Sequence, residues 1–226
     1  MLMKGATRGY ALLALCGAGI GGIGGIAGRL TAQSLRPAVG GLAMTVRMRS
    51  EAGPGATDAL TGTAVGGEGR LVLNRWQLGV TYLEGTLDPK SGSAAARDIV
   101  EGGALLGFRA AVWLTLRTGL QTRAYVLTGG GTQRWVFWTL GARAVRPFVG
   151  SAVDGYVELW RAVSADVNAP QPLDHVQGGE VGMVARLSRT PLDLRLAYRI
   201  DHAVLGGGAR RETVDGLMLG LVLARR

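Results

Sequence analysis

The chain has 226 residues, which is enough for one all-β domain or barrel. Hydrophobic residues make up 47% of it and charged residues only 18%, while its 38 glycines follow no collagen-like period and suit tight turns and closely packed strands. The net charge of +9 comes mostly from arginines, which are spread along the chain instead of gathered in one basic segment, and this argues against a nucleic-acid-binding protein.

The N-terminal segment has the features of an export leader. Lys4 and Arg8 precede an apolar run over residues 10–28, and small residues follow that run. We therefore expect a signal peptide over residues 1–32, cleaved after Ala32, and a folded part over residues 33–226; an uncleaved N-terminal anchor is the alternative. The single cysteine, Cys16, lies in the leader, so no intramolecular disulfide can form.

After the leader, short segments alternate apolar and polar residues with a period of two, which predicts β-strands. They are residues 41–51, 63–74, 76–87, 98–110, 114–126, 134–145, 155–167, 179–187, 192–207 and 213–226. Tight connections alternate with connections that look longer and more polar, and this asymmetry is typical of barrels that cross the outer membrane. The pattern therefore predicts about ten antiparallel strands in one closed barrel.

Three features indicate which face of each strand meets lipid: the expected export of the chain, the different lengths of its connections, and apolar faces that few charged residues interrupt. In residues 192–201, Leu194 and Leu196 alternate with Asp193, Arg195 and Arg199. We expect the apolar face to meet lipid and the charged face to line the lumen as paired arginines and carboxylates, because an unpaired buried charge costs several kcal/mol. The residues predicted to face outward are Leu194, Leu196, Leu217, Leu219, Leu221 and Leu223. The predicted lumen-lining charges are Glu101, Arg109, Arg117, Arg123, Glu158, Glu180, Arg186, Asp193, Arg195, Arg199 and Asp201.

Aromatic residues near strand ends fit the girdles found at membrane interfaces. Trp76 and Trp113 lie near predicted short turns and Trp138 lies nearer the predicted loops, although core packing explains each of them equally well. Arg161 breaks the pattern, since its position is on the predicted lipid face. It must therefore lie near a rim, or a bulge must shift the register.

With these features the chain resembles bacterial outer-membrane β-barrel proteins over residues 36–226. The resemblance implies an all-β fold, an antiparallel transmembrane up-and-down barrel, in the bacterial outer membrane, with outer-membrane lipid as its partner. Such barrels usually end in an aromatic residue read by the assembly machinery, whereas this chain ends in Arg226.

Catalytic chemistry has one candidate site. His175 follows Asp174 and His202 follows Asp201, and outer-membrane proteases of the omptin type carry Asp and His at the loop rim of a ten-stranded barrel. An Asp–His pair can activate water. Adjacent residues on a strand point to opposite faces, however, so Asp201 cannot easily orient His202. We therefore predict that none of the four is catalytic, and we find no metal-ligand spacing, phosphate-binding loop or cofactor motif.

The sequence thus favours a structural or small-pore barrel that is not an enzyme. Arginines outnumber carboxylates on the predicted lumen face, so a pore would prefer anions and a small anionic solute would be its partner. A rim hydrolase built on Asp174, His175, Asp201 and His202 is the runner-up, and a barrel whose loops bind a surface partner is a third class. An open water path would favour the pore, and a closed plug would favour a structural or binding role.

Overall fold

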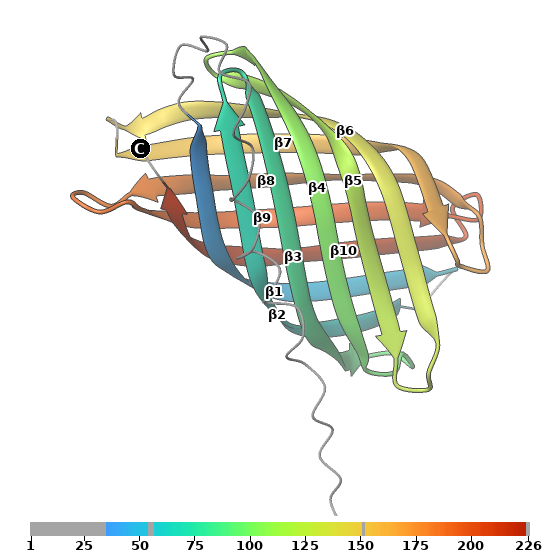
Figure 1. Cartoon of the computed structure of the whole chain (residues 1–226). Coiled ribbons are helices and arrows are strands. Elements are labelled where there is room, and N and C mark those ends of the chain that lie inside the picture. Colours follow the sequence, from blue (N-terminus) through green and yellow to red (C-terminus); the bar gives the residue numbers. More distant parts are fainter. Residues whose placement is uncertain (1–34, 54–56, 151, 225–226) are drawn as a thin grey trace, which may run out of the picture. The chain divides into compact units, whose positions relative to one another are not determined.

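The computed structural model describes residues 35–53, 57–150 and 152–224, and in these ranges the chain forms ten antiparallel strands and no helix (Figure 1). The strands are β1 (Arg36–Ala52), β2 (Thr57–Leu73), β3 (Trp76–Ser91), β4 (Arg97–Ala111), β5 (Leu114–Leu127), β6 (Thr132–Val149), β7 (Val153–Val167), β8 (Leu173–Arg186), β9 (Leu192–Leu205) and β10 (Arg210–Ala224). Within these ranges no helix is long and apolar enough to cross a membrane. The predicted signal peptide lies outside the described residues.

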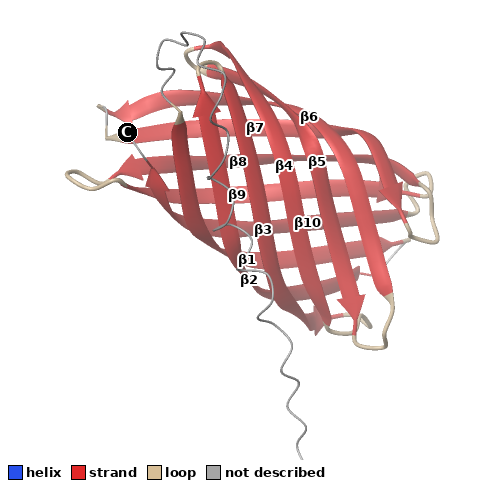
Figure 2. Cartoon of the chain, viewed as in Figure 1, coloured by secondary structure: helices blue, strands red, loops and turns tan. Residues whose placement is uncertain are grey.

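Each strand pairs with its sequence neighbours, and β1 also pairs with β10, so the sheet closes into a barrel without a free edge (Figure 2). The closing register joins Ala38 to Ala224 at one end and Ala52 to Arg210 at the other. Gly216 lies in this seam, where an added Cβ would come within 1.7 Å of the Thr45 carbonyl oxygen. Closure satisfies the backbone groups that an edge strand would expose to lipid. The prediction of a ten-stranded up-and-down barrel is therefore confirmed.

The connections differ between the two ends of the barrel. The turn end includes two-residue turns at Asn74–Arg75 and Val112–Trp113, and Asn74 has the positive φ of 55° that tight hairpin turns require. Four or five residues join the strands at the other end, which we name the loop end. These connections are shorter than the sequence suggested because the strands, of 14 to 18 residues, continue into the predicted loops. His175 consequently lies on β8 and not on a loop.

The outer wall is apolar toward the turn end. Leu194, Leu196, Leu217, Leu219, Leu221 and Leu223 are all exposed there, as predicted. Exposed aromatic rings accompany them, with Trp76 packed against Phe108 at a centroid distance of 5.0 Å near the turns. Since about 9–11 residues of a tilted strand span a bilayer, strands of this length extend beyond it. The outward residues of the loop end are largely polar, so that end is the part that projects.

Strand β1 departs from the predicted orientation. Its large apolar side chains at Leu42, Met44, Val46 and Met48 are buried inside the barrel, and Arg47 and Arg49 face outward. The alternation predicted two faces correctly, but the larger apolar face of β1 fills the lumen instead of meeting lipid. Its inward residues pack into the core, and apart from Val39 its outer face carries small or polar side chains.

Arg161 does face outward, as its place in the alternation indicated. It is exposed, opposite Leu140 on β6 and Gln177 on β8. A register shift between Trp138 and Thr139 follows immediately toward the loop end. The apolar wall of β7 continues past this position, because Val163 is also exposed.

Candidate functional site: the barrel lumen

The loop-end half of the lumen is filled by apolar side chains. Each of the ten strands contributes at least one inward residue to a packed layer, here named the apolar layer. Its members are Met48, Leu60, Leu87, Ile99, Tyr125, Trp135, Val167, Val176, Leu205 and Val214. All but Val167 are almost fully buried. Because side chains from every side of the ring meet here, the layer closes the lumen toward the loop end.

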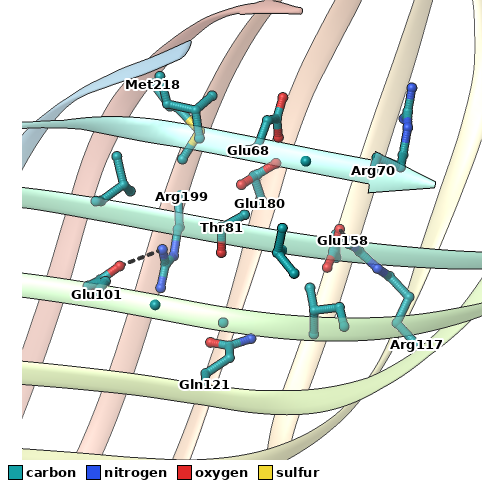
Figure 3. A pocket seen from close by; sticks show the side chains of 18 of the residues that line it. Glu68, Arg70, Thr81, Glu101, Arg117, Gln121, Glu158, Glu180, Arg199 and Met218 are labelled. Carbon is teal, nitrogen blue, oxygen red and sulfur yellow. Dashed lines mark hydrogen bonds and ion pairs between the residues drawn. The ribbon is translucent and has the colours of Figure 1, made fainter. Parts of the chain in front are cut away.

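Below the apolar layer, two arginines and two carboxylates bridge the lumen. Arg123 on β5 binds Glu101 on β4 and Asp201 on β9, each at 2.5 Å. Arg199 on β9 binds Glu101 at 2.8 Å and Asp201 at 2.5 Å. Strands β4 and β9 are opposite each other in the ring, so the Arg199–Glu101 pair crosses the full width of the barrel (Figure 3). We name these four residues the crossing network.

Arg195 organises a second group nearer the turn end. Its guanidinium donates to Glu68 on β2 at 2.7 Å and to Glu180 on β8 at 2.5 Å. Its Nε donates to the Tyr156 hydroxyl at 2.9 Å, and that hydroxyl donates to Glu180 at 2.6 Å. Charge-assisted hydrogen bonds of this kind are short and strong, and here they fix the carboxylates against the wall.

A third group joins Arg117 on β5 and Arg143 on β6 to one carboxylate, Glu158 on β7. Arg117 makes a direct hydrogen bond to Glu158, whereas the Arg143 guanidinium remains 3.6 Å from it. The Arg143 guanidinium lies over the Tyr156 ring, with 3.6 Å between its Cζ and the ring centroid. This cation–π contact holds Arg143 in place without using its N–H donors.

These charges line a cavity of about 160 Å³ in the turn-end half of the lumen. Figure 3 shows Glu68, Thr81 and Gln121 on the near strands facing the same space as Glu158 and Glu180 of the far wall. Among the described residues, Arg70, Gln77 and Gln121 make no hydrogen bond or ion pair that would occupy their polar groups. The site therefore combines a sealed end, a charged middle and a partly empty polar chamber.

Most of the eleven predicted charges meet around this chamber. Glu101, Arg117, Arg123, Glu158, Glu180, Asp193, Arg195 and Arg199 line the cavity, and Asp201 belongs to the crossing network. The other two lie nearer the turn end, where Arg186 pairs with Asp154 and Arg109 is exposed.

Sequence reasoning missed several lumen residues: Glu68, Arg70, Arg143, Asp154 and Tyr156. Arg143 alternates with Ala142 and Ala144, which was a usable signal. Glu68 and Arg70 lie among glycines at 66, 67 and 69, where the alternation has little contrast.

The two histidines meet, but on the outer wall. Their ring centroids are 6.4 Å apart, and His202 Nδ1 is 3.2 Å from the Thr213 hydroxyl. Asp201 points into the crossing network, and Asp174 accepts backbone hydrogen bonds from Gly207 and Gly208 in the β9–β10 connection. Neither carboxylate therefore orients an imidazole ring. The described residues also hold no group of three or more His, Cys, Asp or Glu that could bind a metal ion.

A polar cluster occupies the outer wall above the exposed leucines of β10. Asp215 is 0% exposed because Arg47 and Arg49 of β1 cover it, at 2.6 Å and 3.3 Å, and Tyr198 donates to it at 2.9 Å. The two arginine side chains are themselves 59% and 55% exposed. The cluster presents two guanidinium groups where the apolar wall ends.

No protein-family model matches the chain, and no curated protein sequence matches it. Solved structures of similar fold include the outer membrane protease OmpT from Escherichia coli, which is 7% identical with a TM-score of 0.53, over 86% of this chain and 98% of that one. Neisserial surface protein A (NspA) is 11% identical with a TM-score of 0.39, over 82% and 97%. The translocator domain of the autotransporter NalP from Neisseria meningitidis is 12% identical with a TM-score of 0.43, over 81% and 87%. The fold is that of bacterial outer-membrane β-barrels, and the exposed leucine wall is the surface that such a barrel presents to lipid.

Proposed function

We propose that this barrel is a non-conducting structural protein of the outer membrane, whose lumen is blocked between the loop end and the turn-end chamber. The apolar layer carries the proposal. A conducting pore requires a continuous water path, and a layer of packed side chains from all ten strands leaves no such path. The crossing network supports the same conclusion, because its ion pairs span the lumen just below the layer.

The lipid of the membrane is the partner that the outer wall favours. The exposed leucines suit acyl chains, and the Arg47 and Arg49 guanidinium groups suit the phosphates and carboxylates of a lipid interface. Asp215 keeps both arginines against the wall. The cluster thereby sets the depth of the barrel in the bilayer.

Single-channel recording of the refolded barrel in a planar bilayer tests the proposal. We expect no steady conductance from the wild type. Removing two large side chains of the apolar layer, with Tyr125→Ala and Trp135→Ala, should increase the frequency of opening events, while the outward Trp138→Ala variant should behave as the wild type. Steady conductance by the wild type would overturn the proposal, and its selectivity for anions would support the small-pore function instead.

The rim hydrolase is not favoured by the arrangement of its four residues. General base catalysis requires the base to reach the proton and a carboxylate to orient the imidazole. Here both aspartates are held by other donors, and the histidines face outward from β8 and β9. We accordingly propose no catalytic role for them.

A further inference from the structure

The turn-end chamber has the composition of a ligand site. We infer that it binds a small organic anion, with one carboxylate or phosphate group on a compact apolar body. The inference is independent of conductance, because a chamber open only toward the turn end can still bind a solute. Its failure and the failure of the proposed function are therefore separate results.

Glycines on two neighbouring strands leave the chamber unfilled. Gly79 on β3 and Gly103 on β4 face the cavity, and the strands opposite them in the ring, β8 and β9, carry Glu180 and Arg195. A Cβ added at Gly79 would meet no atom closer than 4.0 Å, and one at Gly103 would meet none closer than 3.4 Å. Both positions could therefore hold larger side chains. The two glycines leave space between the other side chains of this wall, which are Gln77 and Thr81 on β3 and Glu101 and Leu105 on β4.

Arg143 supplies the main anchor for an anion. Its guanidinium makes no hydrogen bond to another described residue, and it is fixed by the Tyr156 ring and by Glu158 at 3.6 Å. Arg117 already binds Glu158, so two guanidinium groups share one carboxylate. Buried cations are normally paired, and the free N–H donors of Arg143 need an acceptor. A planar oxyanion fits the guanidinium fork in two parallel hydrogen bonds.

Arg70 and two glutamines add to this anchor. Arg70 lines the cavity and is exposed toward the turn end, and it has no ion pair with any described residue. Gln77 and Gln121 line the same space and have no hydrogen-bond partner among the described residues. Their amides can donate to an oxyanion or to a neutral polar atom of the ligand. The chamber thus offers several unused donors.

The size and the apolar lining define the rest of the ligand. Leu42, Leu105 and Val184 line the cavity beside the charged groups. A cavity needs roughly 10–15 Å³ for each water molecule that it holds. The cavity of about 160 Å³ therefore has room for a molecule of about ten non-hydrogen atoms. An aromatic monocarboxylate or an aryl phosphate has this size and this division into apolar and anionic parts.

Isothermal titration calorimetry on the detergent-solubilised barrel tests the site with three probes: benzoate, phenyl phosphate and the neutral benzamide. We expect at least one of the two anions to bind with one-to-one stoichiometry and at least tenfold more tightly than benzamide. The stronger of the two identifies the carboxylate or the phosphate as the preferred group. Equal binding of all three probes, or no binding by either anion, would overturn the inference.

Variants locate the binding in the chamber. Arg143→Gln should weaken anion binding at least tenfold, and Gly79→Leu should abolish it by filling the space while every charge is retained. Arg211→Gln changes an exposed arginine of the outer wall and should bind as the wild type does. Circular dichroism checks that each variant is folded. Because Gly79→Leu removes no ion pair, it remains decisive if Arg143→Gln does not fold, and undiminished binding by Gly79→Leu would contradict the site.

Discussion

The crossing network offers a quantitative test of how the lumen is held together. Asp201 is 2% exposed and accepts hydrogen bonds from Arg123 Nη2 and Arg199 Nη2, both at 2.5 Å, and from Arg199 Nε at 3.3 Å. With Glu101 it balances the two arginine charges. The Asp201→Asn variant keeps the shape of the side chain but leaves one positive charge in the lumen without compensation.

The expected loss follows from the burial of all four groups. Removing one partner of a buried ion pair costs about 3–5 kcal/mol of unfolding free energy. Glu101 still binds both arginines in the variant, through Arg123 at 2.5 Å and Arg199 at 2.8 Å, so we expect the lower end of that range, about 3 kcal/mol. Urea unfolding in phospholipid vesicles, followed by tryptophan fluorescence, measures it.

An exposed ion pair of the same barrel is the matched control. Arg134 and Asp166 are 3.7 Å apart on the outer wall, with side chains 63% and 79% exposed. Asp166→Asn should therefore cost less than about 1 kcal/mol. If Asp201→Asn and Asp166→Asn lost equal stability, water would have to reach the crossing network as freely as it reaches the outer wall, and the description of the lumen as closed would be wrong.

Four further outcomes are expected. Leu219→Arg should lower the unfolding free energy by about 2–4 kcal/mol if Leu219 lies near the bilayer centre, and a loss no greater than that of Leu219→Ala in vesicle unfolding would place it outside the membrane. Asp215→Asn should lower the urea midpoint of vesicle-bound barrel, since it weakens the hold on two arginines, and an unchanged midpoint would contradict that role. Gly216→Ala should reduce the folded yield, seen by circular dichroism, because its Cβ would clash with the backbone across the closing seam; a normal yield would show that the seam can relax. The double variant His175→Ala, His202→Ala should keep both the fold and any esterase or peptidase activity, and loss of such an activity would restore the hydrolase hypothesis.

The number of strands and their order could be read from the sequence because both depend on local properties. Period-two alternation comes from the geometry of a single strand, and the turns interrupt it at regular intervals. The outward leucines of β9 and β10 followed from the same pattern. Loop lengths were overestimated, since residues such as His175 belong to strands whose ends carry little apolar contrast.

The direction of β1 could not be read in this way. Alternation divides a strand into two faces but does not say which of them meets lipid. In β9 and β10 the exposed face is the apolar one, whereas in β1 Met44 and Met48 point inward and Arg47 points outward. The choice depends on the volume left in the lumen by the other nine strands, which is a property of the closed barrel.

The sequence by itself therefore determined the strands, their number and the kinds of residue on each face, because neighbouring residues along one chain decide these. The tertiary structure alone decided which charges meet. Arg199 and Glu101 are far apart in the sequence and lie on opposite walls, and only barrel closure brings them to 2.8 Å. The same closure lets Arg195 of β9 bind Glu68 of β2 at the chamber, because register and curvature set these distances and neither is encoded in the alternation of a single strand.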